Sequence, residues 1–202
     1  MNICIFGDSI TWGAFLPFRA GWANLLRNYL ESQDRRIALY DLGIDGNTST
    51  DLLHRFDTEA AARCPDILII AIGTNDSGYR QTIDRPLTPL DEFERNIQVL
   101  LERAKQLSGK ILFVGLVKGD DTLTSPLPRS STGKFYTKVN LKVYNDKLQK
   151  ICQEQSVAFV DINGMLADED FDDGLHPNLG GHQKIFEAVR RSLIKTEFLN
   201  PG

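Results

Sequence analysis

Short apolar runs alternate with amphipathic helical patterns along nearly all of this 202-residue chain. Strands that are buried on both faces of a sheet need apolar side chains at almost every position, and the runs have that character. They occupy residues 2–6, 37–42, 67–72, 111–116 and 157–162. Strands that alternate with helices form right-handed βαβ units around a parallel sheet. The sequence therefore predicts one α/β domain over residues 1–202, a three-layer α/β/α sandwich with about five parallel strands.

The helical patterns each carry one apolar face, most clearly at 90–107 and again at 141–152 and 181–194. Two polar segments, 118–137 and 167–179, follow the fourth and fifth strands and are predicted to be long loops. A loop as long as 118–137 is typically a lid, a binding loop or a disordered segment. Because the strands are parallel, both loops should emerge at the carboxyl edge of the sheet.

Charge and composition restrict the classes of partner and compartment. A formal net charge of −4 gives no general attraction to nucleic acid or anionic lipid. No apolar run approaches the roughly 20 residues that span a bilayer, and the first strand begins too early for a signal peptide. These features predict a cytoplasmic protein with no nucleic-acid partner and no integral membrane segment. Cys4, Cys64 and Cys152 are far apart and are expected to be structural thiols, not metal ligands or disulfide partners.

A serine follows the first strand directly, in Gly7-Asp8-Ser9, and a helical pattern comes after it. The carboxyl edge of a sheet, where such a strand-to-helix turn lies, is where open α/β proteins build their sites. The position of Ser9 therefore predicts a nucleophile. A helix cap is the structural alternative, because serine and aspartate are both favoured there.

A serine nucleophile needs a base and a group that orients the base. Of the three histidines, His54 and His182 lie in helical segments, whereas His176 lies in the loop after the fifth strand. Asp173 stands three residues before His176 and can accept a hydrogen bond from one ring nitrogen, leaving the other to face Ser9. A helix that begins with an acidic residue would show the same spacing.

Donors for an oxyanion are expected from the loops after the second and third strands. Gly46 could present a backbone N–H with no side chain in the way, and Asn75 could present its side-chain amide. Glycine and asparagine are also common in turns that have no other function. Their arrival at successive strand ends, together with Ser9 and His176, favours a common site.

Together these residues resemble the SGNH hydrolases, also called GDSL esterases or lipases, over nearly the whole chain. The blocks of that family are matched in order by Gly7-Asp8-Ser9-Ile10-Thr11, Gly46, Asn75 in Gly73-Thr74-Asn75-Asp76, and Asp173 and His176 followed by Pro177. The resemblance implies a flavodoxin-like sandwich and the hydrolysis of carboxylic esters. Some members act on thioesters, phospholipid acyl groups or acetylated sugars.

The resemblance also implies a mechanism for a small-molecule ester substrate. Ser9 would attack the carbonyl, His176 would move the proton and Asp173 would orient His176. The N–H of Ser9, the N–H of Gly46 and the Asn75 amide would receive the oxyanion, and no metal or organic cofactor would be required. One departure is Asp41, where many members carry asparagine, which could alter the support of the Gly46 loop.

Substrate size is not fixed by the sequence. Aromatic and apolar residues after the nucleophile could wall an acyl pocket or pack in the core; they are Trp12, Phe15, Leu16, Phe18 and Trp22. Two other functions stay open. One is a flavodoxin-like module whose loop 7–13 cradles the phosphate of a flavin or nucleotide. The other is a catalytically silent family member that binds an acyl or glycan ligand.

Overall fold

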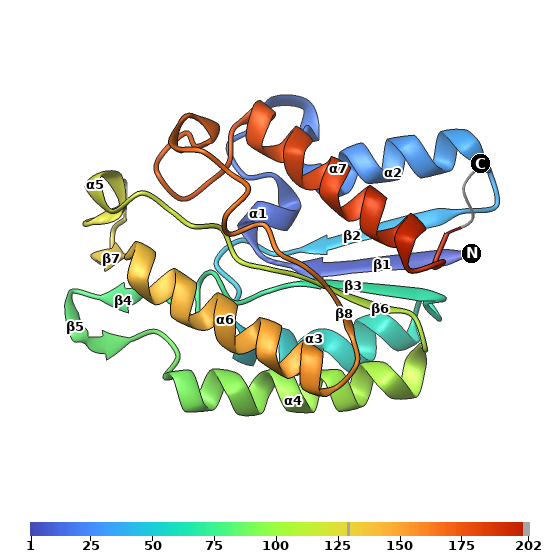
Figure 1. Cartoon of the computed structure of the whole chain (residues 1–202), viewed down its shortest axis with the longest axis horizontal. Coiled ribbons are helices and arrows are strands. Elements are labelled where there is room, and N and C mark those ends of the chain that lie inside the picture. The colour runs from blue at the N-terminus through green and yellow to red at the C-terminus, as the bar shows by residue number, and fades with distance from the viewer. Residues whose placement is uncertain (129, 200–202) are drawn as a thin grey trace.

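The computed structural model describes residues 1–128 and 130–199, apart from the side chain of Arg19. Its central sheet runs in the order β2-β1-β3-β6-β8, with every neighbouring pair parallel (Figure 1). The strands are β1 (Asn2–Gly7), β2 (Ala38–Gly43), β3 (Ile67–Ala71), β6 (Ile111–Val114) and β8 (Ala158–Val160). This is the flavodoxin-like strand order, in which the chain switches direction between β1 and β3. The predicted α/β sandwich with five parallel strands is confirmed.

Side chains alternate between the two faces of the sheet, so each strand contributes to two separate apolar cores. In β1, Ile3 and Ile5 belong to one core, while Cys4 and Phe6 belong to the other. All four are fully buried, which explains why the strand reads as a continuous apolar run and not as an alternating one.

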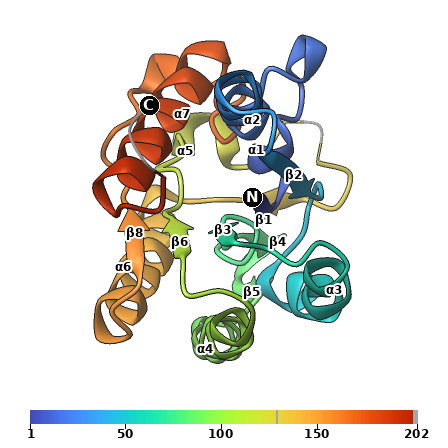
Figure 2. The ribbon, with the colours of Figure 1, turned by 90° about the vertical axis from the view of Figure 1, so that its right-hand side faces the viewer.

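Long helices cover these cores from both sides, as the end view in Figure 2 shows. The first core is covered by α2 (Trp22–Gln33) and α7 (Leu179–Lys195), and the second by α3 (Ser49–Ala61), α4 (Leu90–Leu107) and α6 (Lys138–Glu154). The bounds of α4 are those that its apolar spacing predicts. The other two predicted helices are each a few residues longer than their apolar faces, because their N-caps lie outside those faces.

Polar caps set where these helices begin. Thr48 and Asp51 form a capping box at the start of α3. Thr137 accepts a hydrogen bond from the N–H of Asn140 at the start of α6, and Asn178 accepts one from Gly181 in α7. A side-chain cap at the N-terminus typically stabilises a helix by about 1 kcal/mol.

Short elements gather at the carboxyl ends of the strands, on the left of Figure 1. A second sheet of three antiparallel strands lies there, with β4 (Tyr79–Arg80) between β5 (Thr82–Pro86) and β7 (Lys134–Phe135). The rings of Tyr79 and Phe135 stack across two of its strands at 5.1 Å. The segment 118–137, predicted as one long loop, therefore contains β7 and the single turn α5 (Asp121–Thr124).

Glycine at the end of β2 permits close packing beside the first turn after β1. A Cβ on Gly43 would lie 2.6 Å from the N atom of Trp12 and 2.9 Å from the carbonyl oxygen of Asp8. Both are backbone atoms that could not move without shifting the turn that holds Ser9. Among the described residues, no helix is long and apolar enough to cross a membrane.

Candidate active site

Ser9 is the first residue of α1 (Ser9–Trp12), a single helical turn directly after β1. Asp8 caps this turn, since its carboxylate accepts a hydrogen bond from the N–H of Ile10 at 3.0 Å. The capping role therefore belongs to Asp8 and not to Ser9. The Ser9 hydroxyl instead lies 3.0 Å from Nε2 of His176, and only 5% of Ser9 is exposed.

Asp173 contacts the His176 ring at Nδ1, the nitrogen that does not face Ser9. The Nδ1 atom of His176 lies 2.8 Å from Oδ2 of Asp173. The other carboxylate oxygen accepts the backbone N–H groups of Leu175 at 3.0 Å and His176 at 2.8 Å. Burial alone would raise the pKa of Asp173, but these hydrogen bonds and the histidine together hold it below its ordinary value. An ionised Asp173 favours the tautomer with the proton on Nδ1, which leaves a lone pair on Nε2 facing the Ser9 hydroxyl.

Neighbouring segments fix the backbone around Asp173 and His176. The carbonyl of Gly174 accepts a hydrogen bond from the N–H of Asp120 at 2.7 Å. Gly174 has a φ of +85°, and a Cβ there would lie 2.7 Å from Cβ of Leu123. The turn from Asp173 to His176 is therefore packed directly against the segment that follows β6.

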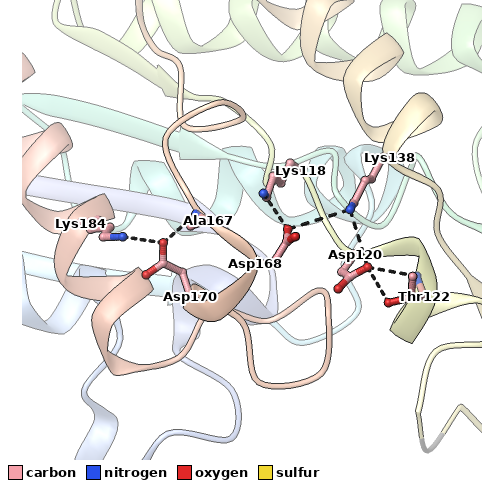
Figure 3. A network of polar contacts seen from close by, with 8 residues as sticks. All are labelled: Lys118, Asp120, Thr122, Lys138, Ala167, Asp168, Asp170 and Lys184. Carbon is pink, nitrogen blue, oxygen red and sulfur yellow. Dashed lines mark hydrogen bonds and ion pairs between the residues drawn. The ribbon is translucent and has the colours of Figure 1, made fainter.

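An ionic network also anchors the loop after β8 (Figure 3). Asp168 pairs with Lys118 at 2.7 Å and lies 3.9 Å from Lys138, which in turn lies 3.7 Å from Asp120. On the other side of the loop, Lys184 of α7 pairs with a buried carboxylate, Asp170, at 2.6 Å. Lysines from three segments thus bind the loop that leads to His176.

Two predicted donor loops meet beside the nucleophile turn. The amide Nδ2 of Asn75 donates to the carbonyl of Asn47 at 3.1 Å, which joins the loop after β3 to the loop after β2. The N–H of Ile44 donates to the carbonyl of Gly7 at 3.1 Å. Between these two contacts stands Gly46, with a φ of +75° and no atom within 4 Å of a Cβ built on it. The backbone of Gly46 is therefore open on the side where a side chain would lie.

Arg55 of α3 also joins the end of β1 to the Gly46 loop. Its guanidinium donates to the carbonyl of Gly7 at 3.1 Å and to Oδ1 of Asn47 at 2.8 Å. One side chain thus donates hydrogen bonds to both the end of β1 and the Gly46 loop.

A buried carboxylate, Asp76, holds the start of α3 next to Asn75. Both of its oxygens accept the backbone N–H of Ser49, at 3.0 and 2.9 Å, and one also accepts the Ser49 hydroxyl. Burial raises the pKa of Asp76 to about 6, and the hydrogen bonds from Ser49 oppose that rise. The Asn96 amide completes the network by donating to the Ser49 hydroxyl at 3.0 Å.

The structure brings together Ser9, His176 and Asp173 and joins the loops of Gly46 and Asn75. The remaining two histidines lie elsewhere. His54 is exposed on α3, whereas His182 is buried and its Nδ1 accepts the N–H of Trp22 at 3.1 Å. Burial lowers the pKa of His182 to about 4, so it stays neutral and links α7 to the start of α2.

Asp41, the departure from the family pattern, supports the end of β2. One of its oxygens accepts the N–H of Gly43 at 3.0 Å and the other accepts the Asn24 amide at 3.0 Å. An aspartate can fill this place because both contacts need an acceptor.

The aromatic residues after the nucleophile divide between core and surface. Trp22 is buried in the first core, whereas Trp12, Phe15 and Phe18 are exposed. The ring of Phe15 meets the His176 ring edge-on at 4.9 Å and is 62% exposed. Phe15 and Phe18 also have left-handed backbone angles, with φ of 68° and 55°. Bulky residues rarely adopt such angles, and strained backbone of this kind tends to cluster at functional sites.

Sequence reasoning missed Tyr136, whose hydroxyl donates to Oδ1 of Asn75 at 3.0 Å. Nothing in the local pattern around residue 136 indicates this contact, because it joins residues 61 positions apart. It also missed Asp76 as an anchor, although Asp76 directly follows Asn75.

A serine, a histidine and an aspartate joined by hydrogen bonds at the carboxyl edge of a flavodoxin-like sheet are typical of hydrolases. The chain belongs to the GDSL-like lipase/acylhydrolase family, whose model matches residues 5–184. Membership of this family makes it a carboxylic ester hydrolase. This assignment favours ester hydrolysis over a flavin- or nucleotide-binding module.

Similar proteins cover nearly the full length of this chain. An isoamyl acetate-hydrolyzing esterase from Saccharomyces cerevisiae is 30% identical over 213 residues, covering 95% of this chain and 85% of that protein. An arylesterase from Vibrio mimicus is 24% identical over 196 residues, covering 96% and 88%. Among solved structures, a lipase/acylhydrolase from Enterococcus faecalis superposes with a TM-score of 0.78 at 20% identity, covering 96% of both chains. The last comparison bears on the fold alone.

Asp8 makes the free energy of unfolding depend on pH. Burial raises the pKa of Asp8 to about 7, against the opposing effects of the Ile10 N–H and of His176. The folded protein therefore holds this proton more tightly than the unfolded chain, in which the pKa of aspartate is about 4. The stability that protonated Asp8 contributes is fully present below pH 4 and is lost as the pH rises through 7.

We expect Asp8→Asn to remove this loss while keeping an acceptor for the Ile10 N–H. Between pH 5 and pH 8, the free energy of unfolding in urea should fall for the wild type relative to the variant by more than about 1 kcal/mol. Parallel curves for the two proteins over that range would contradict the assignment.

Proposed function

We propose that the chain hydrolyses esters through an acyl-enzyme on Ser9, with His176 as general base and acid and Asp173 as the group that orients His176. The observation that carries this proposal is the chain of two hydrogen bonds, 3.0 Å from Ser9 to His176 and 2.8 Å from His176 to Asp173. Distances in this range allow proton transfer from a serine to an imidazole.

The acylation step uses these contacts in order. His176 Nε2 takes the proton of the Ser9 hydroxyl as Oγ bonds to the ester carbonyl carbon. The resulting imidazolium is stabilised by the Asp173 carboxylate and gives its proton to the leaving alcohol. In deacylation, His176 takes a proton from water, the hydroxide attacks the acyl carbon, and the proton returns to Ser9 as the acid leaves.

The oxyanion is received by the N–H groups of Ser9 and Gly46 and by the Asn75 amide. The open side of Gly46 and the fastening of its loop to Asn75 support this assignment. Donors fixed before the reaction need no reorganisation as charge develops on the carbonyl oxygen.

Phe15 indicates the kind of alcohol that the site accepts. Its exposed ring flanks the imidazole that must protonate the leaving oxygen. An apolar surface at that place favours esters of aryl or alkyl alcohols. The isoamyl acetate-hydrolyzing and arylesterase relatives support the same class, and the yeast relative points to a short acyl group.

Ser9→Ala should abolish hydrolysis of aryl esters, because no other nucleophile would lie beside His176. The test is the release of the phenol from aryl esters of graded acyl length, from acetyl to octanoyl. Wild type should hydrolyse the acetyl ester best, and Ser32→Ala, which removes an exposed serine hydroxyl, should match wild type. Activity that survives in Ser9→Ala would refute the nucleophile. No hydrolysis by wild type across the series would point to the catalytically silent alternative.

Asn75→Ala should lower kcat by about 100- to 1000-fold, since the loss of one oxyanion donor costs about 2.7–4 kcal/mol of transition-state stabilisation. The fold should survive, as judged by circular dichroism. The matched control is Asn163→Ala, which removes a part-buried amide that donates to the carbonyls of Leu116 and Val117. Wild-type turnover by a folded Asn75→Ala protein would show that Asn75 is not an oxyanion donor.

A further inference from the structure

Tyr136 approaches the proposed oxyanion hole from the segment that follows β6, and the mechanism above leaves it without a role. Its ring is 1% exposed and its hydroxyl donates to Oδ1 of Asn75 at 3.0 Å. We propose that Tyr136 is a positioning residue that fixes the Asn75 amide as an oxyanion donor. This inference rests on the proposed function of Asn75.

The two contacts of the Asn75 side chain determine which way its amide faces. A backbone carbonyl, that of Asn47, can only accept, so the group that meets it at 3.1 Å must be Nδ2. The other end of the amide is then Oδ1, which accepts the Tyr136 hydroxyl. One N–H of Nδ2 is used by Asn47, and the direction of the second N–H is set by the same plane. Without Tyr136, the bond to Asn47 would be the one side-chain hydrogen bond left to Asn75 among the described residues.

The backbone around Tyr136 is itself held in place. Its N–H donates to the carbonyl of Thr124 at 3.1 Å, and the Thr124 hydroxyl donates to the carbonyl of Tyr136 at 2.8 Å. The ring packs against Gly78, where a Cβ would lie only 2.7 Å from a ring carbon. These contacts therefore fix the position of the Tyr136 hydroxyl beside Asn75.

Charge favours donation by this hydroxyl. Burial raises the pKa of Tyr136, and the carboxylates of Asp8 and Asp45 raise it further, so the phenol keeps its proton. A proton donated to Oδ1 draws electron density through the amide and makes the second Nδ2–H a stronger donor, because linked hydrogen bonds polarise one another. The segment 118–137, expected to be a lid, a binding loop or a disordered segment, would thus contribute Tyr136 to the site.

The test is Tyr136→Phe, which removes one oxygen atom and keeps the buried ring. We expect kcat for an aryl acetate to fall about 10-fold or more, but by less than in Asn75→Ala, while KM stays within about twofold. In the Asn75→Ala background, Tyr136→Phe should cause little further loss, since the amide that it positions is gone. Residues that act through one another show such non-additivity.

Tyr144→Phe is the matched control, because Tyr144 is also buried and its hydroxyl donates to a backbone carbonyl, that of Thr88. It should retain kcat within about threefold. Turnover is expressed per Ser9 labelled by a fluorophosphonate, so that a smaller folded fraction does not lower the apparent kcat. Replacing Tyr136 by 3-fluorotyrosine, which keeps the hydroxyl, should restore kcat.

The inference is overturned if Tyr136→Phe turns over like wild type, or if its loss is as large in the Asn75→Ala background as alone. Either result leaves the proposed function intact, provided that wild type hydrolyses the ester and Asn75→Ala lowers kcat by the roughly 100- to 1000-fold expected for the loss of one oxyanion donor. Failure of the proposed function would look different, because wild type itself would then show no hydrolysis that depends on Ser9.

Discussion

A 3.0 Å hydrogen bond joins Ser9 and His176, which stand 167 positions apart in the chain. This contact requires that β1 and β8, the first and last strands of this sheet along the chain, place the loops that follow them at one edge of the sheet. A parallel sheet does so because the carboxyl ends of all its strands lie at that edge. The close approach of Gly43 to the nucleophile turn and the packing of Gly174 against Leu123 fix the two ends of the contact. Several hydrogen bonds near the site join these loops to neighbouring segments.

Two kinds of support surround the site. On the His176 side they include partly exposed ion pairs, such as that of Lys118 with Asp168, and each such pair stabilises by roughly 0–1 kcal/mol. On the Asn75 side they are buried and include Asp76 and Tyr136, each satisfied by fixed partners. A buried polar network specifies one arrangement more strictly than surface pairs do. The Asn75 donor of the proposed oxyanion hole is therefore held by a buried network.

The sequence predicted the central sheet and three of the long helices well, because burial on both faces leaves long apolar runs and clear helical faces. It missed the three-stranded sheet, whose edge strand β5 is exposed throughout and carries no apolar run. Ser9, Asp173 and His176 could be predicted as candidate site residues because each lies in a loop after a strand, in a distinctive local pattern. Tyr136 was not, since a tyrosine in a polar loop reads as ordinary surface, and only the tertiary fold reveals the amide it meets.

The most direct test of this account is to identify the residue that forms the covalent intermediate. Wild-type protein would be treated with an alkyl fluorophosphonate, digested and analysed by mass spectrometry. The account predicts one adduct, on the peptide that contains Ser9, and a much slower reaction for His176→Ala because the base has been removed. An adduct on another residue, or a protein that hydrolyses esters yet leaves Ser9 unlabelled, would contradict it.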